Sequence, residues 1–294
     1  MSQAISPSTG HPYGLARVCR VWGLARSTGY RHRQERARSS TRRGPVGPCT
    51  DEALVTHIRT ILGASPFHGE GDRKVWARRR YTGIRTSPRR VLRLMRQHAL
   101  LAPQRQGRPH GPRAHDGTIT TARVDTMWGT DMTTTCTRED GQVAIFVAVD
   151  HCSAECIGIH AATRGTRFEA LEPIRQGVRA SCGAFRQEAG LVLRHDQGRQ
   201  YMSHVFQDEL SFLGIASSPA FVREPEGNGC AERFIRTLKE NLLWITTVDP
   251  VEALRVALHA FQRQYNETWL IGRHGYKTPA QVRYEQLEVL AEAA

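Results

Sequence analysis

Three carboxylates give the clearest chemical signal in this sequence. Asp131 lies in a stretch rich in β-branched residues, Asp196 follows the apolar run Leu191-Val-Leu, and Glu232 lies one turn into an amphipathic helical pattern. Carboxylate oxygens suit Mg²⁺, which binds through carboxylates and takes water and phosphate oxygens as its other ligands. Two such ions activate an attacking water or hydroxyl and stabilise the leaving oxygen of a phosphodiester.

The helix that carries Glu232 is predicted to begin at the Gly227-Asn-Gly turn. Its apolar stripe consists of Ala231, Ile235, Leu238 and Leu242, and the adjoining stripe of Glu232, Arg236, Lys239 and Leu243. Lys239 is therefore expected on the same side as Glu232, two turns later, where it would hold a DNA phosphate. A single Asp or Glu is most often a solvated surface residue, so the surrounding pattern carries the prediction.

The motifs around these residues resemble a known family. They are Trp-Gly-Thr-Asp131, His-Asp196-Gln-Gly-Arg-Gln-Tyr and Asn-Gly-Cys-Ala-Glu232-Arg-Phe-Ile-Arg-Thr-Leu-Lys, with 35 residues between the last two carboxylates. This chain resembles the insertion-sequence transposases of the DDE integrase-core (retroviral-integrase-like) superfamily, and in particular their OrfB-type catalytic frame. The resemblance extends from about residue 12 to about residue 285.

The resemblance implies metal-dependent cleavage at transposon ends, followed by strand transfer. Water would free a 3′ hydroxyl that then attacks another phosphodiester. Asp131, Asp196 and Glu232 would bind two Mg²⁺ ions, for which Mn²⁺ can substitute, and Lys239 and Arg236 would contact DNA. The partners would be double-stranded DNA and further copies of the chain, in a homo-multimer that bridges two ends.

Three alternatives stay open. One is a nuclease of the same fold without strand transfer, and another is a DNA-binding regulator with an inactive core. The third is a frame that is active only when fused to an upstream partner, because the first residues lack the heptads of a multimerising coiled coil.

Charge is unevenly distributed along the 294 residues. Residues 1–115 hold 23 Lys and Arg against 5 Asp and Glu, whereas residues 116–294 hold 18 against 23. The N-terminal third is therefore predicted to bind a polyanion, with an affinity that falls with salt. The longest apolar run, 143–149, is far shorter than the roughly 20 residues that span a bilayer, so no membrane partner and a cytoplasmic, nucleoid-associated protein are expected.

Residues 1–48 are predicted to form a helix-turn-helix-like segment. A short helix, a turn at Gly23 and a second helix from about Ser27 are expected, with Ser27 or Thr28 as its N-cap. The DNA-contacting side chains would be Arg26, Thr28, Arg31 and Arg33. Gly29 departs from the family pattern Ser-x-Tyr-Tyr, and a plain two-helix packing unit is the alternative.

Residues 49–104 are predicted to form a basic helical DNA-binding unit. Helices are expected from Thr50, around 73–80, and from Ser87-Pro88, where a cap precedes a proline. Six arginines are expected to point outward: Arg78, Arg79, Arg80, Arg89, Arg90 and Arg93. The alternative is a solvated basic face, although the family has a helical segment with the same Arg-x-x-Arg-Leu-Met-Arg pattern as residues 90–96.

A linker at 105–122 is predicted to lead into a catalytic core at 123–285. Strands are expected at about 127–135, 142–150, 154–161, 191–195 and 214–218, and helices at about 166–180 and 201–213. This order predicts an α/β, ribonuclease-H-like integrase core, a mixed five-stranded sheet with helices on both faces, preceded by small all-α helix-turn-helix-type DNA-binding units. The tail is expected to be a helix at 251–265 followed by an extended arm.

Overall fold

The computed structural model describes residues 3–37, 49–103, 119–182, 190–220 and 228–292. The chain divides into two compact units, Met1–Thr50 and Asp51–Ala294. Most of the predicted linker at 105–122 lies outside the described residues.

The first unit contains two helices, α1 (Leu15–Val21) and α2 (Arg26–Ala37). They are joined by a turn in which Gly23 has a φ of 64°, a conformation that glycine adopts without strain. The expected N-cap is wrong, because α2 already begins at Arg26 and Ser27 and Thr28 lie inside its first turn.

Gly29 is the point where the two helices of this unit approach each other. A Cβ atom at Gly29 would lie 2.8 Å from the Cys19 sulfur and 3.3 Å from a methyl group of Leu15. The departure from the family pattern at this position thus has a packing reason.

The second unit begins with three helices, α3 (Asp51–Ala64), α4 (Asp72–Tyr81) and α5 (Pro88–Gln97). Both acidic residues at the start of α3 lie in its first turn, as the helix dipole favours. The predicted start of α5 is confirmed, since the Ser87 hydroxyl accepts a hydrogen bond from the Arg90 backbone N–H at 3.2 Å. Leu54, Ile58, Val91 and Met95 are fully buried between these helices and their neighbours.

A five-stranded mixed sheet follows in the order β3-β2-β1-β4-β5. Its strands are β1 (Met127–Thr137), β2 (Gly141–Asp150), β3 (Cys156–Ala162), β4 (Val192–His195) and β5 (Ala216–Pro219). The first three strands pair antiparallel, and β4 and β5 run parallel to β1. The predicted ribonuclease-H-like order is confirmed.

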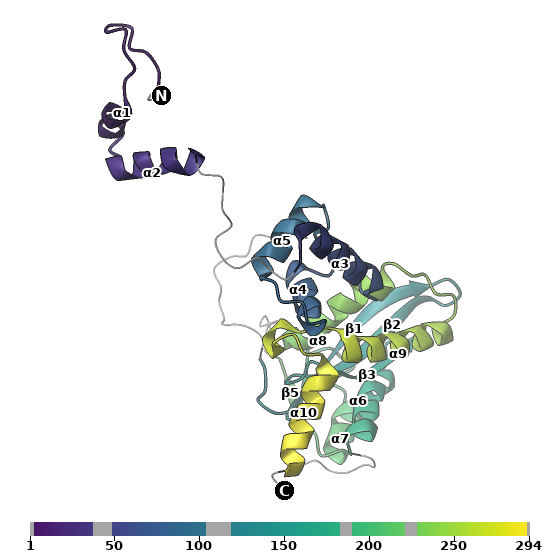
Figure 1. Ribbon diagram of the computed structural model, residues 1–294. Helices are drawn as coiled ribbons and strands as arrows, with labels where there is room; N and C mark the ends of the chain where they lie inside the picture. Colours follow the sequence, from purple (N-terminus) through teal and green to yellow (C-terminus); the bar gives the residue numbers. More distant parts are fainter. Residues whose placement is uncertain (1–2, 38–48, 104–118, 183–189, 221–227, 293–294) are drawn as a thin grey trace. The chain divides into compact units, whose positions relative to one another are not determined.

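Helices cover both faces of this sheet (Figure 1). On one face, odd-numbered residues of β2 such as Val147 pack against α8 (Gly229–Leu238) and α9 (Val251–Thr268). On the other, even-numbered residues such as Phe146 pack against α6 (Arg167–Cys182) and α7 (His204–Phe212). The apolar run 143–149 is therefore a central strand buried on both sides.

The tail differs from the expected extended arm. After α9 and a 3₁₀ turn at Gly272–His274, residues Pro279–Glu292 form another helix, α10. The Arg283 guanidinium binds both carboxylate oxygens of Asp125 just ahead of β1, at 3.1 and 2.6 Å, which fastens α10 to the core. No helix among the described residues combines the length and the apolar character needed to cross a membrane.

Candidate nucleic-acid-cleaving site

Asp131 and Asp196 stand at matching positions on neighbouring parallel strands. Strands β1 and β4 pair in register up to Gly129 and Arg194. Asp131 lies two residues after Gly129, within β1, and Asp196 lies two residues after Arg194, just beyond the end of β4. The pairing of these strands brings the two residues close together, and the charge of Asp196 acts on Asp131.

Each of these carboxylates is oriented by a local backbone donor. Asp131 Oδ1 accepts the Met132 N–H at 2.8 Å, and Asp196 Oδ1 accepts the Gly198 N–H at 2.8 Å. A Cβ at Gly198 would lie 2.6 Å from Gln200 Nε2 and 2.8 Å from Asp196 Oδ1, so a side chain at this position would have to displace both groups. In both residues the second carboxylate oxygen is the one left for a ligand.

Glu232 comes from α8, which packs against β1 and β2. It is the fourth residue of this helix and its side chain is exposed, while Ala231, Ile235 and Leu238 face the core as predicted. The N-cap residue of α8, Asn228, is tied to β1 by a hydrogen bond of 2.8 Å from its side-chain Nδ2 to the Thr130 carbonyl oxygen. Glu232 therefore starts one helical turn from the strand that carries Asp131.

Lys239 marks a change in the helix. Residues Lys239–Leu243 form a π-helical turn, and such turns are frequent at functional sites. Within this turn the Asn241 side chain donates to the Thr237 carbonyl oxygen at 2.9 Å and accepts the backbone N–H of His68 at 2.8 Å. The turn links the helix that carries Glu232 to the segment between α3 and α4.

The electrostatics of Asp131 bring four charges together. Burial raises the pKa of Asp131 from 3.8 to about 6, the Met132 N–H lowers it, and the charges of Asp196 and Glu232 raise it further. The ammonium of Lys239 opposes that increase. Burial also raises the pKa of Glu232. Three carboxylates and one lysine thus act on one another, and a cation placed among the carboxylates would relieve their repulsion.

The donor set fits a hard divalent cation. All three groups offer carboxylate oxygens, and Mg²⁺ is usually held by one or two carboxylates together with waters and substrate phosphates. No three His, Cys, Asp or Glu side chains within the described ranges are arranged as a ready-made metal cage. A site completed by DNA phosphates needs no such cage.

Three neighbouring residues have structural partners. Asp150, at the end of β2, is fully buried and accepts hydrogen bonds from the Ser153 N–H and hydroxyl at 2.6 and 2.8 Å, which cap the turn after β2. His195 has both ring nitrogens engaged, Nδ1 with the Asp196 carbonyl oxygen and Nε2 with the Ser217 hydroxyl. Tyr201 is fully buried among aromatic rings.

Several of the arginines expected to point outward do not. Arg79 is buried, Arg78 binds the buried carboxylate of Glu70 through two hydrogen bonds of 2.8 Å, and Arg90 pairs with Asp51 at 2.6 Å. Arginine can be buried when a carboxylate compensates its charge, and here these pairs join the helices. Of the six predicted arginines, Arg80, Arg89 and Arg93 are exposed, and Arg93 also contacts Asp51.

The other predicted DNA-contacting residues lie on helix surfaces. Arg26 and Arg31 of α2 are exposed and Thr28 is half-buried, whereas the side chain of Arg33 lies outside the described residues. Arg236 is exposed and forms an ion pair with Glu240 at 3.1 Å, one turn later.

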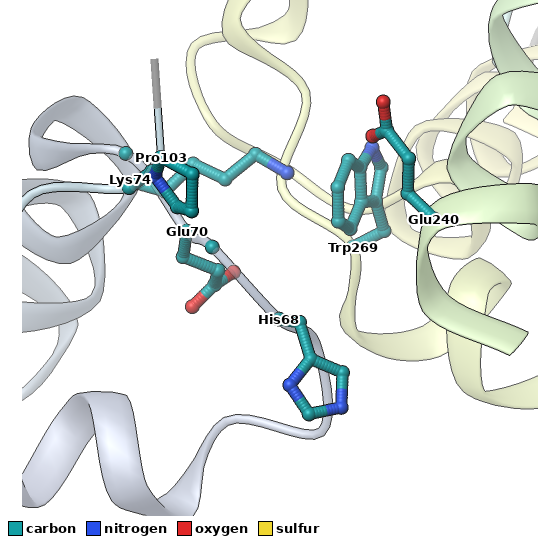
Figure 2. A pocket seen from close by; sticks show the side chains of 9 residues that line it. His68, Glu70, Lys74, Pro103, Glu240 and Trp269 are labelled. Atoms are coloured by element: carbon teal, nitrogen blue, oxygen red, sulfur yellow. The ribbon is translucent and has the colours of Figure 1, made fainter. Parts of the chain in front are cut away.

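A separate cavity of about 590 Å³ lies between the start of α4 and the end of α9 (Figure 2). Its lining residues are His68, Gly69, Glu70, Gly71, Lys74, Ala102, Pro103, Glu240 and Trp269. The Lys74 ammonium lies 2.7 Å from the centre of the Trp269 ring, a cation–π contact between the helical region and the core. None of the three carboxylates lines this cavity.

Two residues of the site were not singled out in the sequence. Asn228 belongs to a Gly-Asn-Gly stretch, which is typical of a turn, and Gly129 lies between Trp128 and Thr130 without a pattern of its own. The two residues approach each other only because α8 packs against β1, so the sequence does not show their contact. The signal available in the sequence was a glycine inside a predicted strand, which often marks a close approach of another group.

Known proteins share these features. Two models of the integrase core domain match residues 121–225 and 213–279. The chain is 28% identical over 236 residues to the Escherichia coli transposase InsD for insertion element IS2A/D/F/H/I/K, which covers 78% of this chain and 77% of that protein.

Solved structures are similar at lower identity. The catalytic core domain of BIV integrase is 21% identical, covers 57% of this chain and 99% of that chain, and superposes with a TM-score of 0.42. A chain from the simian T-cell lymphotropic virus intasome in complex with the PP2A regulatory subunit B56 gamma is 18% identical, covers 80% and 74%, and gives a TM-score of 0.47.

Proposed function

The chain is an insertion-sequence transposase of the DDE integrase-core superfamily, and we propose that Asp131, Asp196 and Glu232 are its catalytic, metal-binding residues. The observation that carries this proposal is the parallel pairing of β1 with β4, which brings Asp131 near Asp196, together with the charges of Asp196 and Glu232 that act on Asp131. The three carboxylates come from three separate elements, and two of them act on the third through their charge.

Divalent metal ions are used by enzymes of this superfamily, and we propose two Mg²⁺ ions, replaceable by Mn²⁺, for this chain. When bound, the ions supply an activated water or hydroxyl and stabilise the leaving 3′ oxygen. The chain's own part is to hold three carboxylates in fixed positions. The backbone N–H groups of Met132 and Gly198 each fix one oxygen of an aspartate, so the other oxygen is oriented toward the ligand.

Basic side chains would hold the DNA. Lys239 stands within electrostatic range of Asp131 and is proposed to bind a phosphate beside the scissile bond. More distant phosphates would bind Arg236, the α2 residues Arg26, Thr28, Arg31 and Arg33, and the α5 residues Arg89 and Arg93. Arg90 is proposed to support α5 through Asp51 instead.

The role proposed for each segment follows the distribution of charge along the chain. Segments 1–48 and 49–104 would engage DNA, 105–122 would connect them to the core, and 123–285 would perform the reaction. The working form would be a homo-multimer on two transposon ends in the nucleoid, with or without an upstream-frame partner. Phosphate contacts position DNA without reading its sequence, so end recognition requires base contacts, for which α2 is the proposed element.

The test is strand cleavage and joining on labelled double-stranded DNA that carries the element's end, with Mg²⁺ or Mn²⁺. Wild type is compared with Glu232→Gln and with the matched control Glu252→Gln, whose side chain on α9 is 72% exposed. Metal-dependent joined products that disappear only in Glu232→Gln support the proposal. Cleavage without joining indicates a nuclease, and salt-sensitive binding without cleavage indicates a regulator or a missing upstream partner.

A further inference from the structure

Asn228 does not use its side chain as an N-cap residue usually does. Asparagine is a favoured N-cap because its side-chain oxygen accepts an N–H group of the first helical turn. At the start of α8 no such bond is made. Asn228 is buried, with 5% of its surface exposed, and its Nδ2 donates to the Thr130 carbonyl oxygen on β1 at 2.8 Å.

This bond connects the elements that carry two of the proposed metal ligands. Thr130 immediately precedes Asp131, and Asn228 precedes Glu232 by four residues, one turn of helix. The Thr130 carbonyl lies one residue beyond the last register pair of β1 and β4, Gly129 and Arg194. Asn228 therefore holds the first turn of α8 against β1 at the point where the β1–β4 pairing ends.

Gly129 makes room for this contact. A Cβ atom there would lie 2.6 Å from Asn228 Oδ1 and 2.6 Å from His151 Nε2, distances that no packed carbon tolerates. A glycine inside a strand weakens the strand and often marks the close approach of another group. Here the approaching group is the Asn228 side chain.

We infer that Asn228 is a positioning residue that sets the distance between Glu232 and Asp131, with Gly129 as its required neighbour. The inference rests on the proposed metal-binding role of these carboxylates. Asn228 is buried and acts through Glu232, without touching DNA. Supporting residues of this kind typically change metal affinity by about tenfold or more when they are removed.

The experiment measures Mn²⁺ binding to the full chain by electron paramagnetic resonance of the free ion. Thermal unfolding and hydrogen exchange of the first turn of α8 are followed in parallel. The variants are Asn228→Ala, Gly129→Ala and their combination. The matched control is Asn266→Ala, because Asn266 also joins a helix to the sheet, through two hydrogen bonds of 2.9 Å to the backbone of Cys156.

Asn228→Ala should weaken Mn²⁺ binding about tenfold and speed exchange in the first turn of α8. Asn266→Ala should lower the unfolding temperature without changing Mn²⁺ affinity. Gly129→Ala should also weaken Mn²⁺ binding, because the new carbon would displace Asn228 as well as His151. The double variant should lose less affinity than the sum of the two single losses, since both changes act on the Asn228 contact.

Wild-type Mn²⁺ affinity and exchange in Asn228→Ala would overturn the inference, as would equal losses of affinity in Asn228→Ala and Asn266→Ala. Should Asn228→Ala fail to fold, Gly129→Ala tests the same contact with Asn228 retained. Failure of the proposed function has a different signature, in which wild type and Glu232→Gln bind Mn²⁺ equally.

Discussion

Asp131 and Asp196 each lie two residues beyond Gly129 and Arg194, the last paired positions of two parallel strands, Asp131 within β1 and Asp196 just past the end of β4. The sheet itself sets the separation of these carboxylates, because neighbouring strands are about 4.8 Å apart. Glu232 is brought to them by a helix, so its position depends on side-chain contacts. The two aspartates form the rigid part of the site and Glu232 the adjustable part.

The raised pKa of Asp131 predicts a pH-dependent cost in stability. Its pKa in the folded chain is about 6 against an ordinary 3.8, so the folded state holds this proton more tightly. The free energy of unfolding should therefore fall as pH rises from about 4 to about 6 and stay lower above that. Asp131→Asn keeps the oxygen that accepts the Met132 N–H and removes the charge. It should stabilise the metal-free chain at pH 7.5 by on the order of 1–3 kcal/mol, with little effect at pH 4.

Denaturant unfolding at several pH values measures this difference. Asp249→Asn is the control, because this aspartate is 51% exposed and pairs only loosely with Arg138, at 3.3 Å. Added Mg²⁺ should stabilise wild type more than Asp131→Asn. A pH-independent difference between Asp131→Asn and wild type would contradict the predicted shift.

Gly198→Ala should disable the site with little loss of stability. The new methyl group would lie 2.8 Å from Asp196 Oδ1 and would displace that carboxylate. A shift of about 1 Å in a reacting group can cost about 10²-fold in rate. Cleavage rates and unfolding temperatures should be compared with Gly63→Ala, a helical position where no atom lies within 4 Å of the new carbon. Wild-type cleavage by Gly198→Ala would show that the carboxylate adapts.

Gly29→Ala should destabilise the first unit, although alanine favours a helix over glycine by about 1 kcal/mol. The added carbon meets the Cys19 sulfur at 2.8 Å, and overpacking of this kind costs about 1–3 kcal/mol. DNA affinity should fall as α2 is displaced. Cys19→Ala should rescue the Gly29→Ala variant in a double-mutant cycle, measured by unfolding and by DNA binding. If the losses of stability in the two single variants simply add in the double variant, the contact between residue 29 and Cys19 does not cause the destabilisation.

Arg89 and Arg78 should respond differently to the same substitution. Arg89 is exposed, so Arg89→Gln should weaken DNA binding and lower the slope of log K against log salt by about 1. Arg78→Gln leaves the buried Glu70 carboxylate without its main partner and should cost about 3 kcal/mol of stability. Binding isotherms at several salt concentrations and thermal unfolding separate the two effects. The assignment fails if Arg78→Gln changes the salt slope and leaves stability intact.

Several individual strands and helices were predictable because their signals are local. The apolar run 143–149, the turn ending at Gly141 and the Ser87-Pro88 cap each act within a few residues. The partners of Arg78 and Arg90 were not predictable, since Glu70 and Asp51 reach them only through tertiary packing. The π-helical turn at Lys239 was also not predictable, because the apolar residues keep a regular period of 3.6 residues through it in the sequence. The supporting role proposed for Asn228 was not predictable, because its two glycine neighbours indicate only a turn.

The parallel pairing of β1 with β4 joins segments that are 65 residues apart in the chain, whereas β1 and β2 meet through a short hairpin. Contacts between distant segments form late, since a long loop must close before they are gained. The hairpin therefore can fold with Asp131 alone, and its partner carboxylates arrive only after α6 has crossed over the sheet. During refolding, metal binding at the proposed site is therefore expected to lag behind the recovery of secondary structure.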